Sequence, residues 1–188
     1  MEKNNPKSER IAKVIARAGF ASRRGAEQII ETGRVSVNGI KISSPVLNIN
    51  KKDKVEIDGK KLSAPERPRM WLFHKPVGLV TTERDEKGRK TIFEVLPEEL
   101  PRVLNIGRLD LNSEGLLLLT NDGSVKRKLE LPSTGWLRRY RVRVKGVPEE
   151  ELLSSLRGGL TLRGEKFRPM DITVDRQKGA NAWMTVAI

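Results

Sequence analysis

The chain has 188 residues, a formal net charge of +13 at pH 7, no cysteine and a single histidine. The missing cysteines exclude disulfides and thiolate nucleophiles, and one histidine argues against a histidine metal cluster or a Ser-His-Asp triad. No segment approaches the roughly 18 apolar residues that span a bilayer, and the polar N-terminus lacks the apolar run of a secretory signal. We therefore expect a cytoplasmic protein that binds no membrane. Its excess of basic residues favours a polyanionic partner, foremost nucleic acid held through its backbone.

The first part of the chain predicts two short helices. Apolar residues at i, i+3, i+4 and i+7 predict a first helix that has Ser8 as its cap and stops at Gly19. Ser22 is a good cap for a second helix, which Gly33 ends. Residues 1–7 are polar and lack periodicity, so we expect them to form a disordered tail.

Two β-hairpins are predicted after these helices. Asn38-Gly39 stands between Val35–Val37 and Ile40–Ile42, and this dipeptide between alternating apolar residues is the strongest short-range hairpin signal. Asp58-Gly59 marks a second hairpin in the same way. Together with the two helices, these hairpins predict a compact basic module over residues 8–62.

Arg23 and Arg24 occupy the first turn of the predicted second helix. The helix macrodipole disfavours cations there by a few tenths of a kcal/mol each. Two arginines placed against this field indicate a site where an external phosphate meets both their charge and the helix N-terminus. The alternative is a solvated basic turn with no ligand.

A linker is predicted at Ser63–Arg69, because its two prolines stiffen the chain and remove backbone donors. Residues 70–188 then predict a larger second domain, and the whole chain predicts an α+β fold: a helix-helix-hairpin module followed by a mixed, mainly antiparallel sheet flanked by helices. The predicted elements of the second domain are strands at Trp71–Phe73, Leu79–Thr82, Leu116–Leu119, Leu137–Lys145, Leu160–Leu162, Phe167–Met170, Asp171–Asp175 and Trp183–Ile188, a helix or turn at Ile92–Leu96, and helices at Ser124–Leu131 and Pro148–Arg157.

The stretch Asn105–Gly123 is the centre of this domain. It places Asp110 in a loop before the short apolar run Leu116–Leu119, which turns on both sides mark as a buried strand. Asn121-Asp122-Gly123 predicts a hairpin-type turn after that strand. Rigid scaffolds display reactive groups on such loops, whereas the plainer interpretation is that the Asp110 carboxylate bonds nearby backbone N–H groups as part of a turn.

The stretch Leu137–Lys145 alternates strictly, as a strand exposed on one face does. One face carries Leu137, Arg139, Arg141, Arg143 and Lys145, and the other carries Arg138, Tyr140, Val142 and Val144. The final strand, Trp183–Ile188, stops without a closing turn, so either it pairs as an edge or the natural protein continues. We expect the second, with residues 70–188 forming a C-terminally truncated domain.

Arg10–Gly39, RIAKVIARAGFASRRGAEQIIETGRVSVNG, resembles the small RNA-binding module first described in a ribosomal protein of the small subunit (the S-four-like module). Its SRR and GRVSVNG pieces occur in order and at the expected separation. The resemblance implies that the module faces structured RNA through Lys13, Ser22, Arg23, Arg24 and Arg34.

Met70–Ile188 resembles the catalytic domain of RNA pseudouridine synthases that modify ribosomal RNA. The matching pieces are HKPVG (His74–Gly78), NIGRLDLNSEGLLLLTNDG (Asn105–Gly123) and RRYRVRVKG (Arg138–Gly146). The resemblance implies isomerisation of a specific uridine to pseudouridine, with a lean toward large-subunit rRNA. An isomerisation of this kind needs no cofactor or metal, and we further expect a monomer.

The same resemblance implies roles for individual residues. Asp110 is the expected nucleophile, and Arg108 is expected to fill the gap left by the flipped nucleotide and to pair with Asp110 or a phosphate. Tyr140 is expected to stack on the uracil and assist proton removal, the alternative being a core aromatic. Lys75 is expected beside the site, shaping the fold and counted with the RNA-binding residues, whereas His74 receives no role. The family places a further basic residue, a partner of the catalytic aspartate, after a late strand, so a truncated chain is expected to be inactive.

Two other functions are compatible with these residues. A non-catalytic rRNA-binding or ribosome-assembly factor would keep its function when Asp110 becomes asparagine, and would bind better if a negative charge were lost. A metal-dependent nuclease would use Asp110, Glu114 and Asp122, but the predicted loops lie at opposite ends of one strand, which argues against a shared two-metal site.

Overall fold

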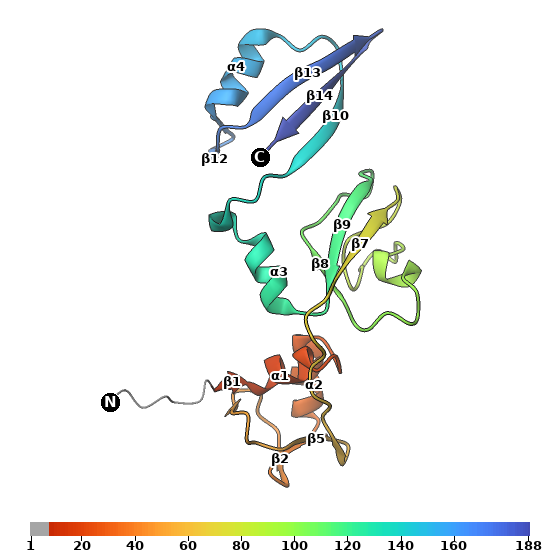
Figure 1. Ribbon diagram of the computed structural model, residues 1–188, viewed down its shortest axis with the longest axis vertical. Coiled ribbons are helices and arrows are strands. Elements are labelled where there is room, and N and C mark those ends of the chain that lie inside the picture. Colours follow the sequence, from red (N-terminus) through yellow and green to blue (C-terminus); the bar gives the residue numbers. More distant parts are fainter. Residues whose placement is uncertain (1–7) are drawn as a thin grey trace, which may run out of the picture. The chain divides into compact units, whose positions relative to one another are not determined.

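The computed structural model describes residues 8–188, so the predicted tail, residues 1–7, lies outside the described part (Figure 1). The chain forms two compact units, of which the first ends at Leu131 and the second comprises Pro132–Ile188. Helices and antiparallel sheets make up both units. The predicted α+β fold is therefore confirmed, and the two units are described separately below.

The N-terminal module of the first unit packs two helices on a small sheet. Its elements are β1 (Glu9–Arg10), α1 (Ile11–Arg17), α2 (Arg23–Glu31), β2 (Val35–Val37), β3 (Ile40–Ile42), β4 (Asn48–Ile49), β5 (Val55–Ile57) and β6 (Lys60–Lys61). The sheet has the order β3-β2-β5-β6, and β1 pairs with β4. Ile11, Ile15, Ile30 and Val35 are fully buried in the core between helices and sheet.

Local sequence signals decide most of this module. Both predicted hairpins are present, and their central residues Asn38, Gly39, Asp58 and Gly59 all have positive φ, as a type I′ turn requires. Ser22 caps α2 as predicted, because its hydroxyl accepts a hydrogen bond from the Gly25 N–H at 3.0 Å.

The cap predicted for the first helix is wrong. Residues Glu9 and Arg10 pair with β4, which keeps the backbone extended through Arg10, so α1 begins only at Ile11. Ser8 therefore lies before a strand and not at a helix N-terminus. The helix end is as expected, with Gly19 in the left-handed region at φ 82°.

The remainder of the first unit is a three-stranded sheet of order β7-β9-β8 with short helices beside it (Figure 1). Its elements are β7 (Met70–Lys75), the 3-10 helix η1 (Ile92–Val95), β8 (Leu104–Ile106), β9 (Gly115–Thr120) and α3 (Gly123–Glu130). No helix or strand occupies the predicted linker, residues 63–69. The strands at 71–73 and 116–119 are present but bury one face only: Leu117 and Leu119 are in the core, whereas Leu72 and Leu116 are exposed.

Two local predictions in this sheet are corrected. Leu79–Thr82 forms no strand, because Val80 makes only an isolated bridge with Thr91 before the chain turns away. Asn121-Asp122-Gly123 forms no hairpin turn. The Asp122 carboxylate accepts hydrogen bonds from the N–H groups of Ser124 and Val125 at 2.6 and 3.1 Å, and so caps α3.

The second unit is a three-stranded antiparallel sheet with one helix. Its elements are η2 (Pro132–Thr134), β10 (Arg139–Lys145), α4 (Glu150–Gly158), β11 (Leu160–Leu162), β12 (Glu165–Phe167), β13 (Asp171–Lys178) and β14 (Asn181–Ala187). The sheet order is β10-β14-β13. Leu153 of α4 packs against Ile172 and Met184 to form the core of this unit.

One strand of the second unit differs from its predicted position, and the last strand is not the edge that one of the two interpretations of the C-terminus required. The strand predicted at Phe167–Met170 lies earlier, at β12, because Glu165–Phe167 pairs with β11 in a tight hairpin. The final strand, β14, is not an edge. It is the central strand, paired with β10 on one side and β13 on the other.

Candidate active site and RNA-binding residues

Residues 107–114 form the loop that carries Asp110 and connects β8 to β9. The side chain of Lys75 binds the backbone of this loop. The side chain of Lys75 exposes none of its surface. Its ammonium donates hydrogen bonds to the carbonyls of Pro76, Asp110 and Ser113 at 3.0, 3.0 and 2.8 Å. An ammonium has three N–H donors, so these three carbonyls satisfy all the donors of Lys75. Lys75 thus fixes the backbone of the loop on both sides of Asp110.

This arrangement corrects the RNA contact predicted for Lys75. A buried ammonium whose three donors are occupied has no surface to offer a phosphate, so Lys75 positions the loop instead, the other role expected for it. Burial lowers the pKa of Lys75 from its ordinary value, and the nearby charge of Asp110 opposes that shift. Charge-assisted hydrogen bonds to carbonyls compensate an ammonium for lost water.

Two further residues from the segment after β7 clamp the same loop. The Gly78 N–H donates to the Leu111 carbonyl at 2.8 Å. The Thr81 hydroxyl donates to the Leu109 carbonyl at 2.7 Å and accepts from the Leu109 N–H at 3.3 Å. The HKPVG motif pointed to this segment, but Thr81 lies outside it, and no local pattern indicated its partner 28 positions away.

The beginning of the loop is attached to α3. The Gly107 N–H donates to the Glu130 carboxylate at 2.8 Å, and Glu130 forms an ion pair with Lys126 at 2.7 Å. The Lys126 ammonium also donates to the carbonyl of Asn105. Sequence analysis missed Glu130 and Lys126, because a charged pair four residues apart on a helix is also what a solvated face contains.

Asp110 itself uses its backbone, not its carboxylate, in this structure. Its carbonyl accepts from the Ser113 N–H at 3.0 Å, which closes a turn, and from Lys75. Within residues 8–188 its exposed carboxylate accepts no hydrogen bond from a backbone N–H, unlike the turn-capping carboxylates of Asp53 and Asp122. Arg108, two residues earlier, is exposed as well. The loop therefore presents a carboxylate and a guanidinium to solvent from a fixed backbone.

Tyr140 belongs to the second unit, where it lies on β10 with its side chain partly exposed. It shares its side of the strand with Val142 and Val144, as the alternation predicted, and Val144 packs against the core of this unit. Asp110 and Arg108 belong to the first unit.

The predicted RNA-binding residues of the N-terminal module fall into two groups. Arg23 and Arg24 are exposed in the first turn of α2 and have no carboxylate partner within residues 8–188. Lys13 instead pairs with Glu9 at 2.6 Å, and Arg34 forms a double hydrogen bond with Asp58 at 3.0 and 2.5 Å. Asp58 raises the pKa of Arg34 through that bond. Arg23 and Arg24 are therefore more available to an external anion than Lys13 and Arg34 are.

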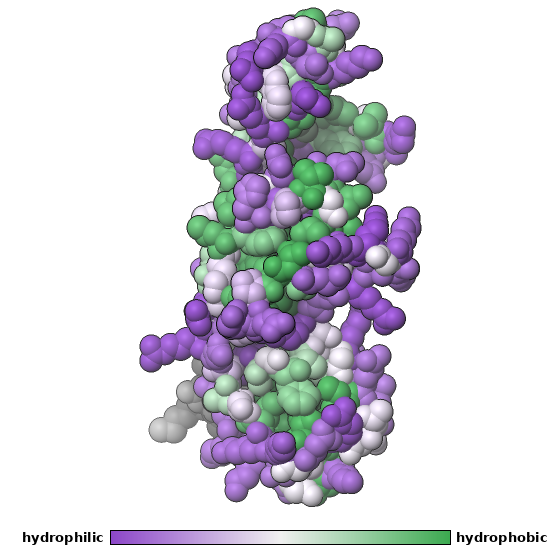
Figure 2. Space-filling view, turned by 90° about the vertical axis from the view of Figure 1, so that its right-hand side faces the viewer, coloured by the Kyte–Doolittle hydropathy of each residue, from purple (hydrophilic) through white to green (hydrophobic). Residues whose placement is uncertain are grey.

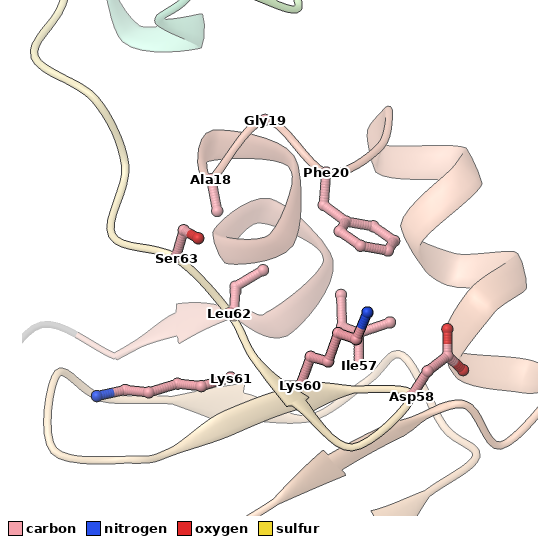
Figure 3. A pocket seen from close by; sticks show the side chains of 9 residues that line it. All are labelled: Ala18, Gly19, Phe20, Ile57, Asp58, Lys60, Lys61, Leu62 and Ser63. Atoms are coloured by element: carbon pink, nitrogen blue, oxygen red, sulfur yellow. The ribbon is translucent and has the colours of Figure 1, made fainter.

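An open pocket of about 450 Å³ lies in the same module, between the α1–α2 turn and the β5–β6 hairpin (Figure 3). Phe20, Ile57 and Leu62 give it an apolar wall, and Lys60 and Asp58 stand at its side. Asp110 does not line it. Across residues 8–188, no group of three or more histidine or acidic residues could hold a metal ion, and no helix is long and apolar enough to cross a membrane.

Comparison with known proteins assigns the chain to a family. A family model described as RNA pseudouridylate synthase matches residues 69–182, and a model described as S4 domain matches residues 9–55. The first match spans more than half of the chain. The protein therefore belongs to the RNA pseudouridine synthase family, as an enzyme that carries an S4 RNA-binding domain at its N-terminus.

Individual relatives agree with this assignment. The chain is 46% identical over 180 residues to an uncharacterized RNA pseudouridine synthase of Rickettsia felis, covering 96% of this chain and 78% of that protein. It is 39% identical over 173 residues to the ribosomal large subunit pseudouridine synthase B of Bacillus subtilis, covering 90% of this chain and 70% of that protein. A crystal structure of a pseudouridylate synthase superposes with a TM-score of 0.59 at 26% identity, covering 94% of this chain and 76% of that chain.

Proposed function

We propose that this enzyme isomerises a specific uridine of large-subunit ribosomal RNA to pseudouridine, with Asp110 as the nucleophile. The observation that carries the proposal is the state of Asp110: an exposed carboxylate without a hydrogen-bond donor in the described chain, on a backbone held by Lys75, Gly78 and Thr81. Fixing a reactive group in place before the substrate arrives removes much of the entropic barrier to reaction. The similarity to the Bacillus enzyme supports large-subunit rRNA as the substrate.

The reaction is an isomerisation, so it needs no oxidant and no energy source. The bond between uracil N1 and ribose C1′ breaks, a bond between uracil C5 and C1′ forms, C5 loses a proton and N1 gains one. The Asp110 carboxylate attacks the target nucleotide, at the ribose or at the uracil ring, and forms the covalent intermediate that lets the base turn. The bond to Asp110 breaks again as the product is completed, which returns the free carboxylate.

The target base has to leave its stack before Asp110 can reach it. Flipping a nucleotide costs a few kcal/mol, and a side chain that fills the vacated space offsets part of that cost. We assign this role to Arg108, which is exposed beside Asp110, and assign to Tyr140 stacking on the uracil and assistance in removing the C5 proton. The N-terminal module holds the RNA through Arg23 and Arg24, where the α2 N-terminus adds its own attraction for phosphate.

The test is pseudouridine formation on unmodified rRNA, mapped by position, for the full chain and two matched variants. Asp110→Asn keeps the shape of the side chain and removes its charge; we expect it to fold, bind RNA and form no pseudouridine. Glu114→Gln makes the same change on another exposed side chain of the loop and should retain activity.

Each outcome has a distinct meaning. Loss of pseudouridine in Asp110→Asn alone supports the nucleophile. Equal activity in both variants would refute it. If the unaltered chain and a version extended past Ile188 both bind rRNA tightly but modify no position, the protein acts as a non-catalytic rRNA-binding factor instead.

A further inference from the structure

The sheet of the second unit has one packed face and one charged face. α4 covers the packed face, where Leu153 and Leu156 meet Ile172, Met184 and Val186. Residues opposite one another in the antiparallel register share a side of the sheet, so the register defines the charged face. We call it the Arg–Trp face, and it comprises Arg139, Arg141, Arg143 and Lys145 of β10, Asn181, Trp183 and Thr185 of β14, and Asp171, Thr173, Arg176 and Lys178 of β13. Hydrophilic residues cover much of the molecular surface in the space-filling view (Figure 2).

Three arginines surround a single tryptophan at the centre of this face. The guanidinium carbons of Arg141, Arg143 and Arg176 lie 5.1, 5.8 and 5.8 Å from the centroid of the Trp183 ring. These distances are within the cation–π range of about 6 Å, in which a guanidinium is attracted to the face of an indole ring. The ring therefore gathers three like charges that would otherwise repel one another.

Within residues 8–188, most of the positive charge of this face has no neutralising carboxylate. Six of its side chains are basic and one is acidic, and a second acid, Asp175, sits in the bulge of β13 beside them. The Asp175 carboxylate accepts from the Thr185 hydroxyl and lies 3.9 Å from Arg141, at the outer limit of an ion pair. Arg143 and Arg176 have no carboxylate within ion-pair distance anywhere in residues 8–188.

The acid that belongs to the face itself is Asp171, at the far end of β13. It pairs across the sheet with Ala187, four residues along β14 from Trp183, so it is remote from the arginine cluster. Arg141 keeps 58% of its side chain exposed despite its contacts. The cluster thus offers unneutralised guanidinium groups to solvent, whose planar donors suit phosphate oxygens.

We propose that the Arg–Trp face is a second RNA-binding surface, which holds the phosphate backbone of the substrate away from the target uridine. Guanidinium groups already lie against the Trp183 ring and compete with any base for it, so the contact is with phosphates and is independent of sequence. Trp183 acts as a platform that keeps the arginines spread and oriented. The proposal rests on the proposed function only in taking RNA as the polyanion.

The experiment is RNA binding by the full chain, measured by filter retention on an rRNA fragment at salt concentrations from about 50 to 200 mM, the range over which phosphate contacts change affinity most visibly. The test variant is Arg143→Ala with Arg176→Ala, which removes the two guanidinium groups that have no carboxylate partner within residues 8–188 and leaves Trp183 in place. The control is Lys166→Ala with Arg168→Ala, which removes the same charge from exposed positions at and just after β12 in the same unit. Circular dichroism establishes that each variant is folded.

Removing one phosphate-binding side chain flattens the plot of log K against log salt by roughly 0.7–0.9. We expect the test variant to lose about 1.4–1.8 in slope and to bind about tenfold or more weakly at low salt, whereas the control stays near the unaltered protein. If the slope of log K against log salt is unchanged in the test variant, the proposal is overturned, and the face would then be expected to bind a protein. Equal losses in both variants would also overturn it, because they would reflect net charge alone.

Pseudouridine formation, measured on the same samples under single-turnover conditions with saturating enzyme, separates this proposal from the proposed function. If the test variant binds RNA weakly but reaches the full rate at saturation, the Arg–Trp face binds the RNA phosphate backbone outside the reacting site, as proposed. If neither the unaltered chain nor a version extended past Ile188 forms pseudouridine while the slope still falls in the test variant, the Arg–Trp face stands and the proposed catalytic function fails.

Discussion

Replacing Lys75 by methionine tests whether a buried ammonium holds the loop that carries Asp110. Methionine keeps an unbranched apolar stem of similar length but donates no hydrogen bond. Three carbonyls would lose the Lys75 donor, those of Pro76, Asp110 and Ser113. The Asp110 carbonyl keeps the Ser113 N–H at 3.0 Å, so two carbonyls lose the donor that the structure shows for them.

The magnitude follows from these two carbonyls. Pro76 is exposed, so water can replace the donor on its carbonyl, whereas Ser113 is half-buried. A buried polar group without a partner costs about 1–3 kcal/mol, so the Ser113 carbonyl accounts for most of the loss. Removing the ammonium also relieves the cost of burying it, a cost that is visible in the lowered pKa of Lys75. We expect Lys75→Met to lower the free energy of unfolding by about 1–3 kcal/mol and to slow pseudouridine formation, because Asp110 loses its support.

The assay combines urea unfolding at neutral pH with single-turnover modification of rRNA. Lys87→Met is the matched control, since Lys87 is exposed in a loop and should tolerate the change within about 0.5 kcal/mol. Unfolding free energies and rates of Lys75→Met equal to those of the control would refute the reasoning. A stable variant with a slow rate would instead show that the ammonium orients the loop without supporting the fold.

Three other predictions concern sites elsewhere in the chain. Arg23→Ala with Arg24→Ala should weaken RNA binding and flatten its salt dependence by roughly 0.7–0.9 for each phosphate that the variant no longer binds, measured by filter retention. Asp122→Ala should lower the free energy of unfolding by about 1 kcal/mol, because α3 loses its N-cap. Hydrogen bonds from the Arg89 guanidinium and from the Arg89 backbone N–H lower the pKa of Asp85 to about 2, so carboxyl NMR should find it near that value, and should find it raised in Arg89→Ala, which keeps only the backbone donors. Because the folded pKa is depressed, the stabilisation from this pair is complete above about 3.8 and is lost as the pH falls through about 2.

These three predictions have their own controls. Lys51→Ala with Lys52→Ala removes the same charge from another exposed turn of the module, and an equal loss of slope there would contradict a phosphate site at α2. Asp122→Asn can still accept a hydrogen bond and should cost less than the alanine variant. An Asp85 carboxyl that titrates at the same pH with and without Arg89 would contradict the ion pair.

Local physics made much of this fold predictable from sequence. The Asn38-Gly39 and Asp58-Gly59 turns need positive φ at both central residues, and Ser22 supplies an acceptor where helix N–H groups lack one, so these elements follow from a few neighbouring residues. Strict alternation likewise placed the arginines and the valines of β10 on opposite sides. The family resemblance, carried by HKPVG and the Asp110 stretch, agrees with the family that the comparisons assign.

Interactions between residues distant in sequence decided the rest. Pairing with β4 extends the chain through Arg10 and displaces the cap predicted at Ser8, an effect that no local signal contains. The family resemblance counted Lys75 with the RNA-binding residues, but the fold buries its side chain, whose ammonium donates to two carbonyls that lie 35 and 38 positions away. Trp183 gathers its three arginines from two other strands. Sequence patterns specify which residues form turns, caps and alternating strands. Only packing determines whether a charged side chain meets solvent, a carbonyl or an aromatic ring, because these partners come from distant parts of the chain.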